Sequence, residues 1–267
     1  MQETTGNTQT HDDTLDPARS AAMHATFGLS GNAPTNGDPL PPFWHKIYFW
    51  DVLPAALLGQ DGHPKTGTGL IPDLGLPQRM WAGGRLTFQK PVLIGQHAKK
   101  STVVENIVQK NGRSGPLAFV TLRHEVSQSH QICITEHQDI VYRTAPQTRP
   151  VIAPPMARTD ETLSEPVAFS PTLLFRYSAL TFNGHRIHYD LEYSKGKEGY
   201  RGLVVHGPML AQLLAHMATR QIGPLKSFSF RATSALMHDE TADLCWCDGT
   251  LWVRGPDGRL CMEATAT

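Results

Sequence analysis

The sequence predicts an α+β protein made of two comparable units, each built around an antiparallel β-meander. Residues 85–143 contain several strand-length apolar segments separated by Gly, Asn or Ser turn signals. Residues 144–167 carry five prolines and little periodicity, which is typical of a semi-rigid linker. A helical pattern and further strand patterns follow this linker. A chain of 267 residues is long enough for two such domains.

The first unit is predicted to span residues 15–143, after a polar and disordered tail of residues 1–14. The stretch 16–28 begins with Asp and Pro, an N-cap residue followed by the residue favoured at the first helical position, so a short helix is expected there. The aromatic side chains of residues 44–50 are expected to enter a core. The sequence QKNGRSG at 109–115 predicts the tip of a hairpin.

The second unit is predicted to span residues 168–267. Residues 169–182 fit either a helix or a strand. From Met209 onward, apolar residues recur with a period of 3.6, which predicts a central helix, and Gly223 with the following proline predicts its end. The remaining segments have strand patterns, and Asp257 followed by glycine predicts the last hairpin.

Composition excludes several classes of protein. Lys and Arg number 24 and Asp and Glu number 24, so the chain lacks the basic surplus expected of a nucleic-acid-binding protein. No apolar run is long enough to predict a membrane span, and the polar, acidic start predicts neither a secretory signal nor a mitochondrial transit peptide. The spacing of the four cysteines favours buried thiols over a disulfide framework, and therefore a reducing cytoplasm. They are Cys133, Cys245, Cys247 and Cys261.

Polar, chemically competent residues crowd the loop TFNGHRIHYD at residues 181–190. A second feature, VVHGPM at 204–209, places a glycine at the start of the predicted central helix, where unpaired N–H groups form an anion site. Chemistry next to a carbonyl requires a proton-transfer residue beside an oxyanion hole. A metal site is the alternative, but His185, His188 and Asp190 lack helical ligand spacing, so no metal is expected.

These motifs resemble a known family. The segment from ALTFNGHRIHYD to EGYRGLVVHGPM is similar to the hydratase-2 signature of MaoC-like enzymes with the hot-dog fold. The N-terminal half resembles the FAS1-like dehydratase half of double hot-dog proteins, and the similarity extends to itaconyl-CoA and mesaconyl-C4-CoA hydratases and type 2 hydroxyacyl-thioester dehydratases. The N-terminal segments that carry it are LPPFWHKIYF, DGHP, LPQRMWAGGRLTFQKPVLIG, KNGRSGPLAFVTLRHE and EHQDIVYR. The resemblance implies a double hot-dog fold whose first unit shapes the acyl pocket and whose second unit is catalytic.

The resemblance also implies the catalytic residues. The histidine of the signature falls on His188, and the glycine whose amide faces the thioester oxygen falls on Gly207. The acidic position falls on Asn183, which is a departure, because an amide positions water but cannot act as a base. We therefore expect His188 to transfer the proton. Asp190 is either a structural residue or the partner of His188, and His206 either braces the helix entry or takes part in catalysis.

Arginines are candidates for binding the substrate. Arg186 or Arg176 is expected to pair with the free carboxylate of a dicarboxylate-derived acyl group, unless it forms an ion pair within the loop. In the stretch RMWAGGR at 79–85, Arg79, Trp81 and Arg85 are candidates for facing the CoA or the acyl chain. The alternative for this stretch is a bulge at its two glycines.

The favoured function is hydration or dehydration of an enoyl thioester, most specifically hydration of itaconyl-CoA or mesaconyl-C4-CoA to a citramalyl- or methylmalyl-type CoA. The runner-up is a (3R)-hydroxyacyl-ACP or -CoA dehydratase of fatty acid metabolism. The neutral Asn183 also keeps open a catalytically silent thioester-binding subunit. The expected partners are an acyl-CoA or acyl-ACP substrate and a second copy of the chain in a homodimer. No cofactor, nucleic acid or membrane is expected.

Overall fold

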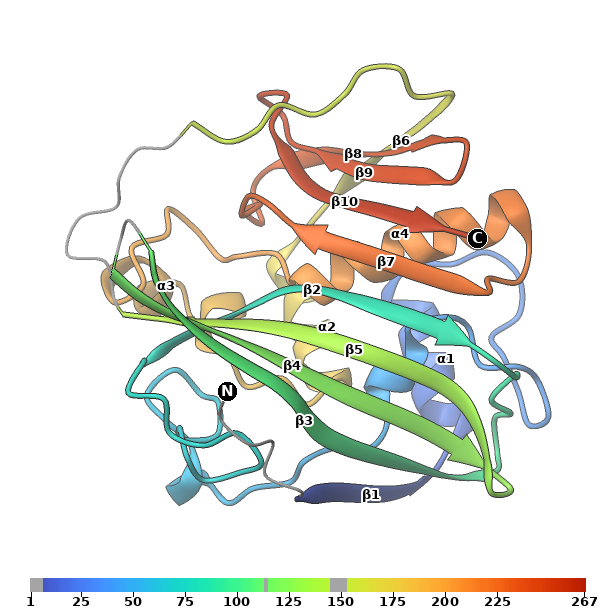
Figure 1. Cartoon of the computed structure of the whole chain (residues 1–267). Helices are drawn as coiled ribbons and strands as arrows, with labels where there is room; N and C mark the ends of the chain where they lie inside the picture. The colour runs from blue at the N-terminus through green and yellow to red at the C-terminus, as the bar shows by residue number, and fades with distance from the viewer. Residues whose placement is uncertain (1–6, 113–114, 145–152) are drawn as a thin grey trace.

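The computed structural model describes residues 7–112, 115–144 and 153–267. Within these residues, ten strands form one antiparallel sheet in the order β1-β3-β4-β5-β2-β7-β10-β9-β8-β6 (Figure 1). The first five strands of this order belong to the N-terminal unit and the last five to the C-terminal unit. The strands are β1 (Thr8–Thr14), β2 (Gln78–Phe88), β3 (His97–Gly112), β4 (Gly115–Gln128), β5 (Gln131–Arg143), β6 (Leu163–Ala168), β7 (Ser227–Ala232), β8 (Thr241–Cys247), β9 (Thr250–Arg254) and β10 (Leu260–Ala266).

The helices lie behind this sheet in the view of Figure 1. They are α1 (Pro17–Thr26), α2 (Pro171–Leu180), α3 (Leu191–Gly196) and α4 (Gly207–Ile222), with the short 3-10 turns η1 (Trp44–Ile47), η2 (Ala55–Leu57) and η3 (Arg186–His188). The segment 169–182, which fitted helix or strand, thus contains helix α2.

The two predicted sheets are joined edge to edge. Residues 83–87 of β2 pair with residues 227–231 of β7. A Cβ atom on Gly83 would lie 2.6 Å from the carbonyl oxygen of Phe230, so glycine is what allows the two strands to approach. The register of β2 on β5 shifts between Trp81 and Gly83, which is the predicted bulge.

Helix α4 is the predicted central helix of the C-terminal unit. It contacts each of β7, β8, β9 and β10, so this half of the sheet wraps around it. Gly223, with φ of 79°, ends the helix as the sequence predicted. The residues that α4 buries in the core include Met209, Leu210, Leu214 and Met217.

In the N-terminal unit, α1 and an aromatic segment fill the core. The Asp16 side chain accepts a 2.8 Å hydrogen bond from the Ala18 N–H, which is the predicted N-cap. The Trp44 indole N–H donates a 2.7 Å hydrogen bond to Nε2 of His216 on α4, so the cores of the two units are continuous. The fully buried side chains of the aromatic segment are Phe43, Trp44, Ile47 and Tyr48.

The prediction of a disordered tail is wrong for residues 8–14. They form the edge strand β1, which pairs with residues 97–103 of β3. Asp13 anchors this strand, because its carboxylate accepts hydrogen bonds from Arg19 (2.7 Å) and from the Phe49 N–H (3.0 Å). Backbone pairing and a partly buried acceptor offset the low apolar content that suggested disorder. Residues 1–6 lie outside the described residues.

The linker is shorter than predicted. Strand β6 begins at Leu163, inside the predicted linker 144–167, and pairs with β8. Residues 145–152 lie outside the described residues, as do residues 113–114 at the predicted hairpin tip. The hairpin itself is confirmed, since β3 pairs with β4 up to Gly112 and Gly115.

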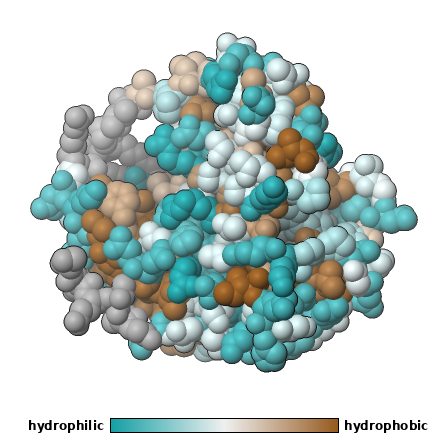
Figure 2. Space-filling view, turned by 45° about the vertical axis from the view of Figure 1, so that its right-hand side comes forward, coloured by the Kyte–Doolittle hydropathy of each residue, from teal (hydrophilic) through white to brown (hydrophobic). Residues whose placement is uncertain are grey.

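Hydrophilic and hydrophobic residues are interspersed on the face shown in Figure 2. Across the described residues, no helix has the length and apolar character needed to span a membrane.

Candidate active site

A cavity of about 350 Å³ is lined by residues of both units. One side comes from β2, β5 and the loop that precedes β2, and the other comes from residues 183–188, the start of α4 and β10. Both units therefore contribute to the cavity wall. The lining residues with chemically relevant groups include Asp61, His63, Arg79, Trp81, Arg143, Asn183, His185, His188, Glu198 and Gly207.

His188 is held in one tautomer. Its Nδ1 lies 2.7 Å from the carbonyl oxygen of Val204, which can only accept, so Nδ1 carries the hydrogen and Nε2 is left as the acceptor. The side chain is 7% exposed. Burial lowers the pKa of His188 to about 4, against a smaller opposing effect of the Val204 carbonyl, so the ring is neutral at pH 7. A neutral imidazole with a free Nε2 is a competent general base.

His206 supports the His188 ring. The two rings stack with centroids 3.6 Å apart and planes 19° apart. Nε2 of His206 hydrogen-bonds the Ser178 hydroxyl of α2 at 2.8 Å, and the side chain is fully buried. Burial holds the pKa of His206 well below its ordinary value, so this ring is also neutral. His206 does not line the cavity. Its position against the far side of the His188 ring therefore favours the bracing role over direct contact with substrate.

Gly207 opens helix α4 at the cavity wall. The first intrahelical bond runs from the Leu210 N–H to the His206 carbonyl, so the Gly207 N–H has no partner within the helix. Pro208 follows and has no N–H of its own. A Cβ atom added to Gly207 would meet nothing within 4 Å, so open space lies beside this amide. The arrangement leaves one helix N-terminal donor facing room for a carbonyl oxygen.

Asn183 is tied to its own loop. Its Oδ1 accepts a 3.0 Å hydrogen bond from the His185 N–H, which leaves the side-chain amide as a donor at the cavity wall. The structure thus places Asn183, His188 and Gly207 on one cavity.

A loop of the N-terminal unit crosses the loop that bears His188. The Arg186 N–H donates to the Asp61 carbonyl at 2.9 Å. A Cβ atom on Gly62 would lie 1.9 Å from the Gly184 carbonyl oxygen, and one on Gly184 would lie 2.5 Å from the Gly62 carbonyl oxygen. The two backbones therefore cross at a pair of glycines, and no other residue type fits there.

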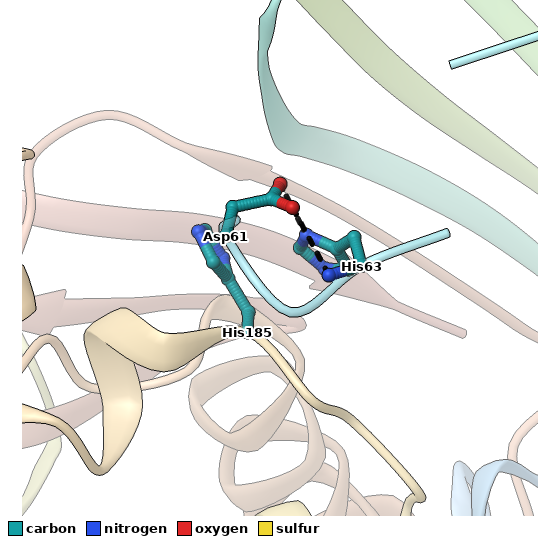
Figure 3. Close-up of side chains that lie close together, drawn as sticks. All are labelled: Asp61, His63 and His185. Atoms are coloured by element: carbon teal, nitrogen blue, oxygen red, sulfur yellow. Dashed lines mark hydrogen bonds and ion pairs between the residues drawn. The ribbon is translucent and has the colours of Figure 1, made fainter. Parts of the chain in front are cut away.

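This crossing gathers Asp61, His63 and His185 (Figure 3). The Asp61 carboxylate lies 3.1 Å from Nδ1 of His63, and ring centroids of His63 and His185 are 4.3 Å apart. Burial raises the pKa of Asp61, while burial and the neighbouring His188 lower the pKa of His185 to about 3. Ligand atoms of the three side chains lie within 4.8 Å of one another, a spacing in which a divalent cation could also be held.

Other candidate residues lie elsewhere. Arg186 bonds the Asp190 carboxylate at 2.7 and 3.0 Å, which is the ion pair considered as the alternative. Asp190 caps α3 through the Tyr193 N–H at 3.0 Å and does not line the cavity. Arg176 is exposed on α2, and Arg85 is exposed and pairs with Asp139 at 2.6 Å. Of the residues proposed to bind substrate, Arg79 and Trp81 line the cavity.

Comparison with known proteins identifies the family. Residues 43–238, more than half of the chain, match the sequence profile described as hydroxyacyl-thioester dehydratase type 2. The chain belongs to the hydroxyacyl-thioester dehydratase type 2 family. It is 44% identical over 269 residues to mesaconyl-C(4)-CoA hydratase of Chloroflexus aurantiacus, with 97% of this chain and 95% of the relative covered. Members of this hydroxyacyl-thioester dehydratase family are hydro-lyases.

Solved structures confirm the predicted double hot-dog fold. A MaoC-like dehydratase from Phytophthora capsici has a TM-score of 0.70 at 16% identity, covering 98% of this chain and 96% of that chain. A Mycobacterium tuberculosis protein with a double hot-dog fold has a TM-score of 0.57 at 14% identity, covering 98% and 95%.

In this member of the hydroxyacyl-thioester dehydratase family, sequence reasoning missed Asp61 and His63 as site residues. A signal for them exists, because Asp61-Gly62-His63 repeats the pattern of Asn183-Gly184-His185. Two short loops with the same acid-or-amide, glycine and histidine order are candidates for related roles. Only the fold shows that they meet.

Proposed function

We propose that this chain catalyses the reversible addition of water to an enoyl-CoA thioester, with mesaconyl-C4-CoA as its substrate. The observation that carries the proposal is the pairing of a neutral, tautomer-fixed His188 with the free Gly207 N–H on one cavity. These are the two groups that hydration next to a thioester carbonyl requires. The 44% identity to a mesaconyl-C(4)-CoA hydratase over nearly the whole chain supports the substrate.

The steps follow from this geometry. Nε2 of His188 takes a proton from water as the water oxygen forms a bond to Cβ of the enoyl group. The electron pair of the double bond moves toward the thioester oxygen, which becomes an enolate oxygen held by the Gly207 N–H at the start of α4. Asn183 orients the water through its side-chain amide. A second proton must then reach Cα to complete the product.

The free carboxylate of the acyl group needs a cation. Arg186 is engaged by Asp190, so we assign this role to Arg79 of β2, which lines the cavity. Arg79 donates one hydrogen bond to the Pro64 carbonyl at 3.1 Å, and its guanidinium has further N–H groups to offer. Its charge also acts on Asp61, which places it near the group of side chains at the loop crossing. Arg143 is the other arginine on the cavity wall.

Dehydration of a longer (3R)-hydroxyacyl thioester is the second candidate. The family description supports it, and so do apolar side chains on the cavity wall. The lining residues of this kind include Met80, Ile140, Leu210, Leu236 and Met262. A volume near the lower end of the range for small-molecule sites favours the short C5 acyl group.

A direct assay tests the proposal. Purified protein is given mesaconyl-C4-CoA, itaconyl-CoA, crotonyl-CoA and a long-chain enoyl-CoA, with product detected by mass. We expect hydration of a dicarboxylate-derived thioester, and a fall of about 10²–10⁴-fold in kcat for His188→Ala. Turnover of only the neutral substrates would replace the proposal by the dehydratase function. Failure with all CoA and ACP thioesters would leave a silent thioester-binding subunit.

An arginine variant tests the substrate class. Arg79→Gln should lower kcat/KM for mesaconyl-C4-CoA by about 10–100-fold, the worth of one hydrogen bond to a charged group, and should spare crotonyl-CoA. Arg143→Gln is measured in parallel. An equal loss for both substrates in Arg79→Gln would contradict carboxylate recognition by Arg79.

We also propose that the protein works in the cytoplasm as a homodimer. Its four cysteines are free thiols, which suits a reducing compartment. Light scattering after size-exclusion chromatography measures the oligomeric state, and a monomer mass would refute the dimer.

A further inference from the structure

We propose that Asp61 and His63 form a second acid–base pair of the active site, which supplies from the N-terminal unit the carboxylate that position 183 lacks. This inference rests on the proposed hydratase function. It assigns to the pair the protonation of Cα in the hydration direction and the removal of the Cα proton in the dehydration direction.

The two crossing loops share one local hydrogen-bond pattern. Asp61 Oδ1 accepts a 3.1 Å hydrogen bond from the His63 N–H, two residues later. Asn183 Oδ1 accepts a 3.0 Å hydrogen bond from the His185 N–H, also two residues later. Asp61 is therefore the counterpart of Asn183 in the facing loop. Of these two loops, one carries a carboxylate and the other an amide, and the carboxylate lies on the loop of the N-terminal unit.

The crossing fixes the pair at the reaction centre. Gly62 and Gly184 contact each other backbone to backbone, and the Arg186 guanidinium donates to the Gln60 carbonyl at 3.1 Å. Asp61 and His63 both line the cavity that His188 lines, with side chains 24% exposed. They are thus accessible to a substrate in the cavity while being held against the loop that bears His188.

Figure 3 shows the carboxylate of Asp61 directed at the His63 ring, with His185 beside both. The 3.1 Å contact joins Asp61 to Nδ1 of His63, so Nε2 of that ring is left for another partner. A carboxylate bound at Nδ1 orients an imidazole and stabilises its protonated form. The ring of His185 lies 4.3 Å from that of His63 and 5.4 Å from that of His188. His185 therefore neighbours the rings of both acid–base groups.

The protons taken up and released by the two groups are equal in number in this arrangement. His188 takes one proton from water as the C–O bond forms at Cβ. The His63 imidazolium gives its Nε2 proton to Cα, and the enolate electron pair forms the new C–H bond. His188 then holds one proton more than at the start and His63 one fewer. Transfer from His188 through His185 to His63 restores both groups, and the net reaction is addition of one water molecule.

Two conservative variants test the assignment. Asp61→Asn keeps the acceptor for the His63 N–H, and His63→Asn keeps a side-chain donor toward Asp61, but neither variant can perform the transfer. Each should lower kcat by about 10²-fold or more, with an unchanged melting temperature. Asp73→Asn, in the same connection but exposed and outside the cavity, is the matched control and should be fully active. Wild-type kcat in both site variants would overturn the inference.

Isotope exchange separates the two proton transfers. The hydroxyacyl-CoA product is incubated in D₂O, and exchange at Cα is compared with net loss of water. His188→Ala should retain Cα exchange while water loss falls, and His63→Asn should lose Cα exchange. The reverse pattern would show that His188 serves Cα. An inactive wild-type enzyme would instead count against the proposed function, so the two failures are distinguishable.

A metal measurement completes the test. Dialysis against EDTA should leave the activity of the wild-type enzyme unchanged, and the purified protein should contain no stoichiometric zinc. Loss of activity on chelation, with recovery on added Zn²⁺, would overturn the acid–base assignment and make Asp61, His63 and His185 metal ligands.

Discussion

The His188 ring stacks on the His206 ring, with centroids 3.6 Å apart. Two imidazoles in this contact cannot both carry a charge at low cost, because burial already disfavours the charged form of each. The Ser178 hydroxyl holds His206 from behind. The proposed base, His188, is therefore positioned by a second histidine that does not line the cavity.

We expect His206 to act through ring packing. His206→Phe preserves a planar ring behind His188 and should retain kcat within a few-fold, whereas His206→Ala removes the support and should lower kcat by about 10²-fold. Steady-state kinetics on both variants measures this. The idea fails if the phenylalanine variant is as impaired as the alanine variant, because the imidazole itself would then be needed.

Gly207→Ala should abolish most activity without loss of stability. The added methyl group meets no protein atom within 4 Å, but it occupies the space beside the N–H that we propose binds the enolate oxygen. Loss of one such donor lowers kcat by about 10²–10³-fold. Gly196→Ala, at the end of α3 and also free of contacts within 4 Å, is the matched control. A fully active Gly207→Ala variant would exclude this amide from the oxyanion site.

Gly184→Ala should separate the two crossing loops. Its Cβ would lie 2.5 Å from the Gly62 carbonyl oxygen, so one backbone has to move. We expect destabilisation of about 1–3 kcal/mol, as for other overpacked sites, together with a fall in kcat. Urea unfolding and the hydration assay measure the two effects. Unchanged values for both would mean that the crossing is not needed for the site.

The protein should lose stability as pH falls from about 6.5 to 4. Nε2 of His216 accepts a hydrogen bond from the Trp44 N–H and must be unprotonated, and burial lowers its pKa to about 4. In this pH window the unfolded chain binds a proton that the folded chain does not. The free energy of unfolding therefore decreases by about 1.4 kcal/mol per pH unit for each such histidine. His124, His185 and His188 also have lowered pKa values.

Urea unfolding at pH 7.5, 6 and 5 checks this dependence. His216→Gln keeps an acceptor for Trp44 but removes one titrating group, so its stability should depend less steeply on pH. A slope identical to that of the wild type would show that His216 is charged in the folded protein.

The elements with strong periodicity were predictable from sequence. Helix α4 and the strand pattern of residues 85–143 follow from apolar spacing, and Gly223 ends the helix where the sequence placed the end. Strand β1 was not predictable, because its stability comes from pairing with β3 and from the partly buried hydrogen bonds of Asp13, which composition does not encode.

The candidate site likewise contains residues that the sequence predicts and residues that only the fold reveals. His188 and Gly207 are candidates that the signature indicates, and both lie on one cavity. Asp61 and His63 stand more than 100 positions away along the chain, so only the fold shows that their loop crosses the one at residues 183–188. Arg186 illustrates the converse: its position in the motif suggested substrate binding, but Asp190 four residues later engages its guanidinium.

The pairing of β2 with β7 has a consequence for how this chain can be divided. A fragment that ended in the linker would expose one long unpaired strand edge on each half and would separate the two glycines at which the loops cross. Neither half would then retain a complete site, and each exposed edge would be a template for aggregation. Coexpressed halves should recover activity only by reassembling at that edge, which makes the β2–β7 junction the obligatory point of complementation.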